Sequence, residues 1–168
     1  KKTGADHVSF CLELYGADRF KEICPGKYKY MSQKLYLEAM EHCVKVFGRG
    51  RVAGEIIAGL EAPGDTIKAI ENFAKSGIVS TVCIFRPCIG TDLENLAPPS
   101  AEEMMPVFKA VYKSSIENNI PIGIAPRIKV SLVLLPEEGK YFLEEHSLKF
   151  YAAELKLGIL KFLSSGVN

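Results

Sequence analysis

Two side chains of opposite charge stand near the end of the first apolar segment of the chain, residues 7–14. Glu13 lies in that segment, and Arg19 follows it closely. A carboxylate accepts hydrogen bonds from an ammonium group, and a guanidinium can bind a carboxylate through two parallel hydrogen bonds. Because an amino acid carries both groups, this pair suits an amino-acid-like ligand. A local salt bridge between Glu13 and Arg19 is an equally good interpretation.

The second apolar segment, residues 51–60, contains two glycines and is followed by a carboxylate. Gly54 and Gly59 allow another backbone or a flat ligand to come close to the chain. Three residues between them offer an apolar wall: Ile56, Ile57 and Ala58. Glu61 is then placed to pair with polar groups at the end of the segment. The alternative is an ordinary junction between a strand and a helix.

A proline-rich loop, residues 86–100, follows the third apolar segment. Arg86 and the turn at Gly90 and Thr91 are candidates to line the open mouth of a binding site. Its prolines restrict the loop, which suits the rim of a site: Pro87, Pro98 and Pro99. A purely structural turn fits this pattern equally well.

The five cysteines are odd in number and match no disulfide scaffold: Cys11, Cys24, Cys43, Cys83 and Cys88. A reducing, cytoplasmic location fits this pattern, and each thiol is expected to be a small buried apolar group. The spacing from Cys83 to Cys88 is not that of a zinc site. The sequence also contains no serine elbow, phosphate loop or dinucleotide glycine motif.

Strand and helix patterns alternate along the chain. Short apolar runs predict strands over residues 7–14, 51–60 and 78–85, and a β-rich stretch at 121–135 is a candidate for a fourth. Helices are predicted over 32–48, 66–77 and 101–119, and the tail from 139 to 166 is mostly helical in pattern. Residues 16–27 are expected to form a loop or a short helix ended by a proline and a glycine.

Helix boundaries are marked by capping residues. Ser32 is expected to cap the helix 32–48, and Gly48 stands where a helix ends. Asp65 or Thr66 is predicted to begin the next helix. Ser100 and Glu103 have the spacing of a capping box. Two apolar faces are predicted: Leu35, Ala39, Cys43 and Val46 in the first helix, and Ile67, Ile70, Phe73 and Ala74 in the second.

This alternation predicts one α/β domain, residues 1–168, with a parallel sheet and right-handed crossovers. Ligands of such sheets bind at the carboxyl ends of the strands, where the charged and glycine residues described above are found. Helix caps and turns alone would also place many of these residues there. Three or four strands alone leave an open sheet, and a parallel sheet needs both faces covered.

The composition is that of an ordinary globular chain, 48% hydrophobic and 24% charged. The net charge of +1 argues against nucleic acid or an anionic membrane surface as the main partner. We see no apolar stretch long enough to cross a membrane. We therefore expect no nucleic-acid and no membrane partner.

Three segments in this order resemble the radical S-adenosylmethionine (radical SAM) family, in particular the group of biotin synthase, the hydrogenase maturase and methylornithine synthase. HVSFCLELYGADRFKEICPGK is similar to the end of the family's fourth strand, with its glutamate, arginine and proline. GEIIAGLEAPGDT is similar to the fifth strand beside the adenine, although the spacing to Glu61 departs by one residue. FRPCIGTDL matches the family's P-x-x-G-T-x-L segment after the sixth strand.

The resemblance implies that the chain is the C-terminal half of a (β/α) TIM-type barrel. Residues 1–126 are the family-like part, and residues 127–168 form a C-terminal strand and helical extension. Six residues are then expected to contact S-adenosylmethionine: Glu13, Arg19, Ile57, Gly59, Glu61 and Arg86. Glu13 and Arg19 would bind its methionine end.

The family's cluster motif, C-x-x-x-C-x-x-C, is absent from this chain. The resemblance places the motif, and the 4Fe-4S cluster that it holds, in an upstream half of the barrel. Reductive cleavage of S-adenosylmethionine needs that cluster. We therefore expect the chain to be inactive alone and to need the N-terminal half as a partner, together with an unknown small-molecule substrate.

Two other functions remain open. One is a non-catalytic binding or assembly domain that keeps the barrel fold. The other is a piece of an unrelated (β/α) barrel lyase, which a catalytic lysine at a strand end would favour. The terminal helix is expected either to close the barrel or to contribute to a homodimer.

Overall fold

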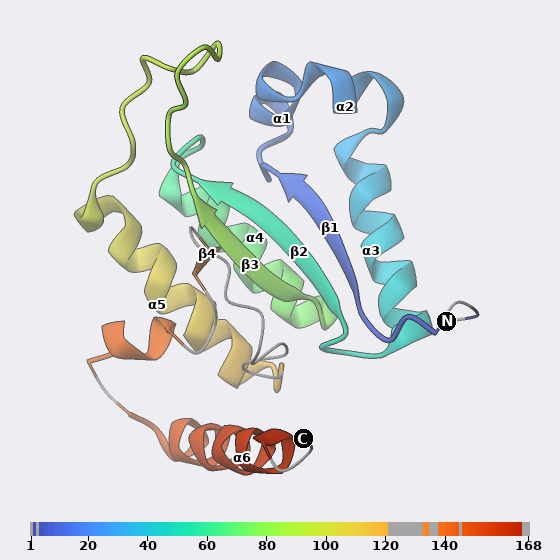
Figure 1. Ribbon diagram of the computed structural model, residues 1–168, viewed down its shortest axis with the longest axis vertical. Helices are drawn as coiled ribbons and strands as arrows, with labels where there is room; N and C mark the ends of the chain where they lie inside the picture. Colours follow the sequence, from blue (N-terminus) through green and yellow to red (C-terminus); the bar gives the residue numbers. More distant parts are fainter. Residues whose placement is uncertain (1, 3, 121–132, 135–137, 145, 166–168) are drawn as a thin grey trace.

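The computed structural model describes residues 1–168 except for 1, 3, 121–132, 135–137, 145 and 166–168. Its centre is a sheet in the order β1-β2-β3-β4 (Figure 1). Strands β1 (Val8–Glu13), β2 (Val52–Ala58) and β3 (Val79–Ile84) are parallel, as the alternating pattern predicted. Strand β4 (Val133–Leu134) is short and pairs antiparallel with β3.

The antiparallel β4 corrects the prediction of a wholly parallel sheet. The predicted fourth strand covered 121–135, of which only the two residues of β4 lie in a strand among the described residues. The parallel rule applies where a helix carries the chain back to the start of the next strand. Helix α5 stands between β3 and β4 in the chain, yet the two strands are antiparallel, and the residues 121–132 that lead into β4 lie outside the described part of the chain.

The helices alternate with the parallel strands. Helices α1 (Ala17–Ile23), α2 (Pro25–Tyr30) and α3 (Gln33–Phe47) join β1 to β2, and α4 (Pro63–Ser76) joins β2 to β3. Helix α5 (Ala101–Glu117), the 3₁₀ helix η1 (Gly139–Phe142) and α6 (Leu148–Ser165) follow β3. The segment 16–27 therefore forms one short helix and enters a second, and Pro25 begins α2 instead of ending a helix, because proline suits the first helical position.

Most of the predicted caps are confirmed. The Ser32 side chain accepts a hydrogen bond from the Leu35 N–H group, and Gly48 ends α3. Ser100 and Glu103 form the predicted capping box at the start of α5.

The start of α4 differs from the prediction. The helix begins at Pro63, with Ala62 as its N-cap and no side-chain cap. The carbonyl oxygen of Ala62 accepts from the N–H groups of Asp65 and Thr66, so these two residues already lie inside the first turn. Proline at the first position supplies the helical φ angle without a capping side chain.

The buried face of α3 also differs from the prediction. Leu35 and Val46 are exposed, whereas Met40 is fully buried. Four further residues of α3 pack against the core beside Met40: Leu37, Cys43, Val44 and Phe47. Several faces of α3 carry apolar residues, so periodicity alone could not choose between them. The predicted face of α4 is confirmed, with Ile70, Phe73 and Ala74 buried and Ile67 packed beside them.

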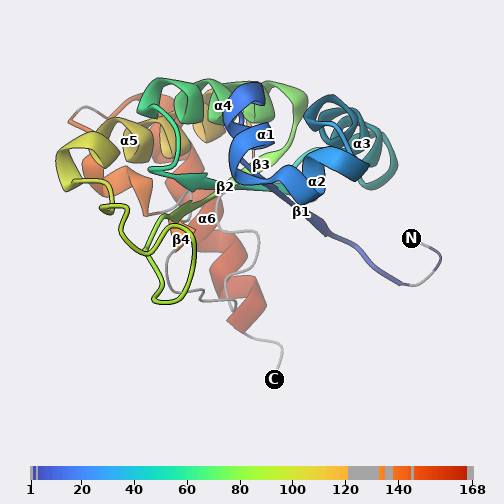
Figure 2. The same cartoon turned by 90° about the horizontal axis from the view of Figure 1, so that it is seen from above.

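One face of the sheet carries the helices. Helices α1–α5 gather on the same side of the strands (Figure 2). Gly54 of β2 lies on that side, since a Cβ atom there would come within 2.6 Å of side-chain atoms of Met40 in α3 and Phe73 in α4. In β2 the residues toward the helices are buried and those between them are half-buried. The fold is thus a three-stranded parallel sheet alternating with helices, and no closed barrel forms among the described residues.

Helix α6 docks on α5 through a small apolar cluster. Leu157 packs with Tyr112 and Ile116 of α5, and Phe150 and Ala153 lie beside them. The Tyr112 hydroxyl donates a 2.8 Å hydrogen bond to the Glu154 carboxylate, which also binds Lys140 at 2.6 Å. Burial and this carboxylate both raise the pKa of Tyr112, which keeps its hydroxyl a donor.

Candidate functional site

The carboxyl ends of the three parallel strands meet at one edge of the sheet. Glu13 ends β1, Gly59 follows β2, and Arg86 lies just beyond β3. Figure 1 shows the connections that leave these ends rising together at the top of the sheet. The topology therefore brings the three sequence motifs to a common edge, as a parallel sheet requires.

Glu13 binds a lysine that the sequence did not single out. The Lys27 ammonium, from α2, donates to the Glu13 carboxylate and, at 2.8 Å, to the carbonyl oxygen of Cys11. It also lies 5.9 Å from the centre of the Tyr36 ring. Burial lowers the pKa of Lys27, but the hydrogen bond and charge of Glu13 outweigh burial, so its net pKa is raised. Lys27 is thus held as a cation at the end of β1.

The backbone at Glu13 is unusual. Its φ angle of 75° is in the left-handed region, and the register between β1 and β2 shifts between Cys11 and Glu13. A non-glycine residue in this region costs about 1–3 kcal/mol and is most frequent at functional sites. The bulge turns the Glu13 side chain to where it meets Lys27.

Arg19 does not form the local salt bridge with Glu13. Its Nε and Nη2 groups donate to the carbonyl oxygen of Leu60 at 3.1 and 2.9 Å, and its Nη1 group binds Glu22 at 2.6 Å. The guanidinium therefore ties the loop after β2 to α1. Its side chain remains 41% exposed, and N–H groups of Nη1 and Nη2 remain for a further acceptor.

Glu61 is buried and accepts hydrogen bonds from the turn after β1. The N–H groups of Tyr15 and Gly16 donate to its carboxylate at 3.0 and 2.7 Å, and the Thr66 hydroxyl donates at 3.3 Å. The side chain is 8% exposed, so these donors replace water around a buried charge. Glu61 fixes the turn that carries Glu13 and Arg19.

Gly59 and Ile57 shape the end of β2. Gly59 has a φ angle of 100°, and a Cβ atom there would lie 2.5 Å from the Pro99 side chain. The loop after β3 therefore packs directly on the Gly59 backbone, which only glycine permits. Ile57 packs against the apolar cluster at the same edge of the sheet: Leu14, Phe20, Leu60 and Phe85.

Arg86 is exposed at the start of the loop 86–100. The predicted turn is present, since the Thr91 hydroxyl donates to the Cys88 carbonyl at 2.7 Å and the Gly90 N–H to Glu94 at 2.7 Å. These bonds hold the loop without any contribution from the Arg86 side chain. Among the described residues no hydrogen bond or ion pair of the Arg86 side chain is found, and the side chain is exposed.

Sequence reasoning missed a cluster of two thiols and a carboxylate on the sheet face opposite the helices. Cys11 of β1 stands beside Glu55 of β2, and Cys83 of β3 lies one strand further. Burial raises the pKa of both thiols and Glu55 raises it further, to about 11 for Cys83. No ion pair of the described residues involves Glu55.

The alternation of side chains between the two faces of β2 could have identified this cluster. Gly54 and Ile56 face the helices, so the side chains of Glu55 and Ile57 must point to the other face. Cys11 and Cys88 are exposed and the other cysteines are half-buried, which corrects the prediction of five buried thiols. Lys27 gave no comparable signal, because its partner is distant in sequence.

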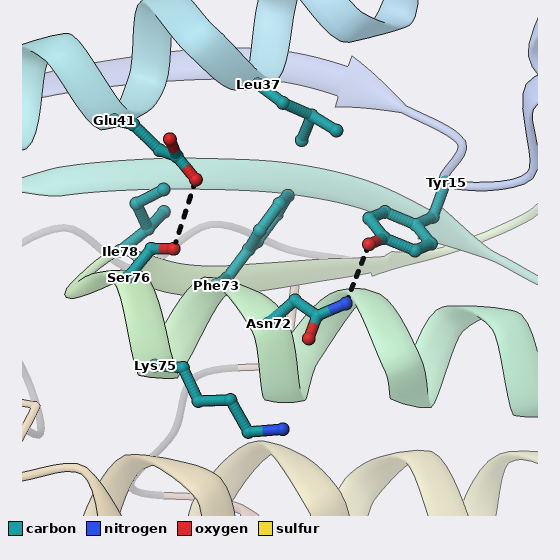
Figure 3. A pocket seen from close by; sticks show the side chains of 8 residues that line it. All are labelled: Tyr15, Leu37, Glu41, Asn72, Phe73, Lys75, Ser76 and Ile78. Atoms are coloured by element: carbon teal, nitrogen blue, oxygen red, sulfur yellow. Dashed lines mark hydrogen bonds between the residues drawn. The ribbon is translucent and has the colours of Figure 1, made fainter.

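A hollow of about 280 Å³ lies between α3 and α4, and Figure 3 shows its lining. Apolar side chains of Leu37, Phe73 and Ile78 form part of it. Four of its polar groups are paired, since Asn72 donates to the Tyr15 hydroxyl at 2.7 Å and Ser76 to Glu41 at 3.4 Å. Because these groups are already paired, we regard the hollow as a gap in helix packing.

The described residues contain no group of three metal-ligating side chains. No described helix is both long and apolar enough to cross a membrane.

The chain is 32% identical to the bacteriochlorophyllide c C-7(1)-hydroxylase of Chlorobaculum limnaeum. The match covers 112 residues, which is 66% of this chain and 28% of that protein. The chain thus spans little more than a quarter of this relative. No family model matches the chain, and no solved structure matches it.

This similarity supports, in coarse terms, the resemblance to radical SAM enzymes. Membership of the biotin-synthase-like group, the binding of S-adenosylmethionine and the nature of the substrate remain proposals. The hydroxylase is an enzyme that acts on a bacteriochlorophyllide, as its name states.

Proposed function

We propose that the chain is part of a radical SAM enzyme and contributes the contacts to S-adenosylmethionine. The observation that carries the proposal is the meeting of Glu13, Arg19 and the Gly59 segment at one edge of a parallel sheet. These are the segments whose order resembles the family. The similarity to a hydroxylase supports an enzymatic parent protein.

The bonds of Lys27 support an ammonium site at Glu13. Its ammonium is bound by the Glu13 carboxylate and the Cys11 carbonyl, which are the acceptors that an α-ammonium group would use. A ligand would take over these acceptors as Lys27 moves aside. The unused N–H groups of Arg19 would meet the carboxylate of the same ligand.

Glu61 has a different part in the proposal. Its carboxylate is occupied by Tyr15, Gly16 and Thr66, so we propose that it positions the turn and does not contact the ligand. Ile57 and Gly59 would offer an apolar wall and an open backbone to the adenine. Arg86 would lie at the mouth of the site.

Together with an upstream half, the bound S-adenosylmethionine and 4Fe-4S cluster would supply a 5′-deoxyadenosyl radical to an unknown substrate. This chain would hold the methionine end in place and keep its charges paired. We propose that the upstream half also completes a barrel together with this sheet, with helices α1–α5 on the outside.

The lyase alternative requires a lysine at a strand end, and Lys27 lies beside the end of β1. A lysine that attacks a carbonyl must lose its proton, which a lowered pKa favours. Glu13 raises the pKa of Lys27, so its amine is held protonated. This argues against Lys27 as a nucleophile and leaves the radical SAM proposal ahead.

The test is a calorimetric titration of S-adenosylmethionine into the chain, alone and mixed with the upstream segment of its parent protein after cluster reconstitution. We expect binding in the reconstituted mixture. Glu13→Ala and Arg19→Ala should each weaken it by roughly tenfold or more, because each removes a charge-assisted contact.

Glu38→Ala is the matched control, since this carboxylate is exposed on α3 and distant in sequence from the motif residues. It should bind like the unchanged chain. Absence of binding under every condition would overturn the proposal and favour a non-catalytic domain or an unrelated barrel.

A further inference from the structure

The ammonium group of Lys27 lies in a site built from three different kinds of group. The Glu13 carboxylate and the carbonyl oxygen of Cys11 accept its hydrogen bonds, the second at 2.8 Å, and the centre of the Tyr36 ring lies 5.9 Å away. Together these groups suit a primary ammonium, which offers three N–H donors and a positive charge. Both oxygen acceptors belong to β1, where the register shift and the left-handed φ angle of Glu13 fix the backbone.

Lys27 is held less firmly than the acceptors that it binds. It belongs to α2, a helix of six residues, none of which is buried. Its side chain is 34% exposed, against 19% for Glu13, and its stem of four carbons is flexible. The ammonium can therefore turn into the solvent, where water hydrates it, while the two acceptors of β1 stay in place.

We infer that Lys27 is a tethered occupant of a primary-ammonium site, and that the ammonium of a ligand enters this site only by displacing it. The inference rests on the proposed function for the identity of that ligand, S-adenosylmethionine, and adds that the chain competes with its own ligand. A group tethered nearby competes at an effective concentration in the millimolar range. The apparent affinity for the ligand then falls with the fraction of molecules whose site is empty.

The alternative is a salt bridge that only attaches α2 to β1. Such a pair needs neither the Cys11 carbonyl nor the Tyr36 ring, and both lie around the Lys27 ammonium. Lys68 and Asp65 of α4 form a simple pair of this kind, with their charged groups 2.9 Å apart and side chains that are 67% and 41% exposed. This pair provides the matched control for the experiments.

The first test replaces the Lys27 side chain with a small ammonium ion. Lys27→Ala should lower the Tm, and propylammonium chloride should restore roughly 2–4 °C of the loss, because this ion supplies the atoms that the substitution removes. Tetramethylammonium chloride carries the charge without an N–H donor, so it should restore nothing. Lys68→Ala should gain nothing from either salt. No rescue of Lys27→Ala, equal rescue by both salts, or equal rescue of Lys68→Ala would reduce the contact to a salt bridge and overturn the inference.

The second test measures the binding of S-adenosylmethionine in the reconstituted mixture. Lys27→Ala should bind it roughly tenfold more tightly than the unchanged chain, because the competitor is gone. Lys27→Gln, which is closer to lysine in size and serves if the alanine variant does not fold, should also bind it more tightly. Lys27→Arg keeps a cation beside Glu13 and should show no such gain.

The two tests separate this inference from the proposed function. If S-adenosylmethionine binds and the alanine and glutamine variants bind it equally or more weakly than the unchanged chain, displacement of Lys27 is refuted and the proposed function stands. If propylammonium rescues Lys27→Ala but S-adenosylmethionine binds to no form of the chain, the ammonium site stands and the proposed function is overturned.

Discussion

Three glutamates in or just after β1 and β2 have different surroundings, although the sequence presents all three as carboxylates in or beside apolar segments. Glu13 binds the Lys27 ammonium, and Glu61 is surrounded by backbone N–H groups. Glu55 lies between the thiols of Cys11 and Cys83. Glu13 suits an exchangeable cation, and Glu61 fixes a turn. Glu55 adds to the effect of burial, which is the larger cause of the raised pKa of the two thiols.

Removing the charge of Glu55 should lower the pKa of Cys83. In Glu55→Gln the pKa should fall below its value of about 11 but stay above the usual 9.0, because burial is the larger cause and remains. Alkylation of Cys83 by iodoacetamide, followed across pH by peptide mass spectrometry, measures this shift. Glu38→Gln on α3 should leave the pH midpoint unchanged, and an unchanged midpoint in Glu55→Gln would contradict the role of Glu55.

The same pKa shift predicts how stability depends on pH. The folded chain keeps the Cys83 proton up to about pH 11, whereas the unfolded chain loses it near pH 9.0. The unfolded state therefore gains relative stability as the pH rises through this interval.

At the scale of elements, hydrogen bonds join the segment that follows β1 to the segment that follows β2. Glu61 accepts from the turn after β1, and Arg19 donates to the carbonyl oxygen of Leu60 after β2. The loop after β3 joins them where Pro99 packs on Gly59. Residues named as ligand contacts thus also fix the edge of the sheet, so binding and stability have to be measured separately.

Gly59→Ala should destabilise the chain by about 2–4 kcal/mol, because a Cβ atom meets Pro99 and the left-handed φ angle is strained. Gly64→Ala in α4 is the control, since a Cβ atom there meets nothing within 4 Å. It should be neutral or stabilising by up to about 1 kcal/mol. Urea unfolding measures both changes, and equal effects would refute the packing of the loop on Gly59.

At the scale of the whole molecule, helices α1–α5 lie on one face of the sheet, and the thiols lie on the opposite face (Figure 2). Cys11 is exposed on that second face. A parallel sheet is normally covered on both faces, which supports the proposal of a second half.

If the upstream segment completes a barrel, its addition should slow the alkylation of Cys11 by roughly tenfold or more, since reaction then requires opening of the barrel. Cys43 in α3 lies on the side of the helices and should react at an unchanged rate. If the mixture forms a complex and the labelling rate of Cys11 is unchanged, the barrel is refuted. The proposed binding of S-adenosylmethionine is tested separately by the calorimetric titration.

The sequence by itself determined the three parallel strands, the helices between them and most of the caps. These depend on local periodicity and on side chains that bond the backbone a few residues away, such as Ser32, Ser100 and Glu103. It also placed Glu13, Gly59 and Arg86 at strand ends, because strands that alternate with helices must run in one direction. The position of each motif at a strand end could thus be predicted without knowing the distances between the residues in space.

Only the tertiary structure decided which groups meet. Lys27 reaches Glu13, Glu61 reaches Tyr15 and Gly16, and Pro99 reaches Gly59 across long stretches of sequence. The choice of the buried face of α3 and the direction of β4 were likewise settled by packing. The physical reason is that such contacts depend on how elements stack, and many partners are compatible with the same local pattern until the chain is folded.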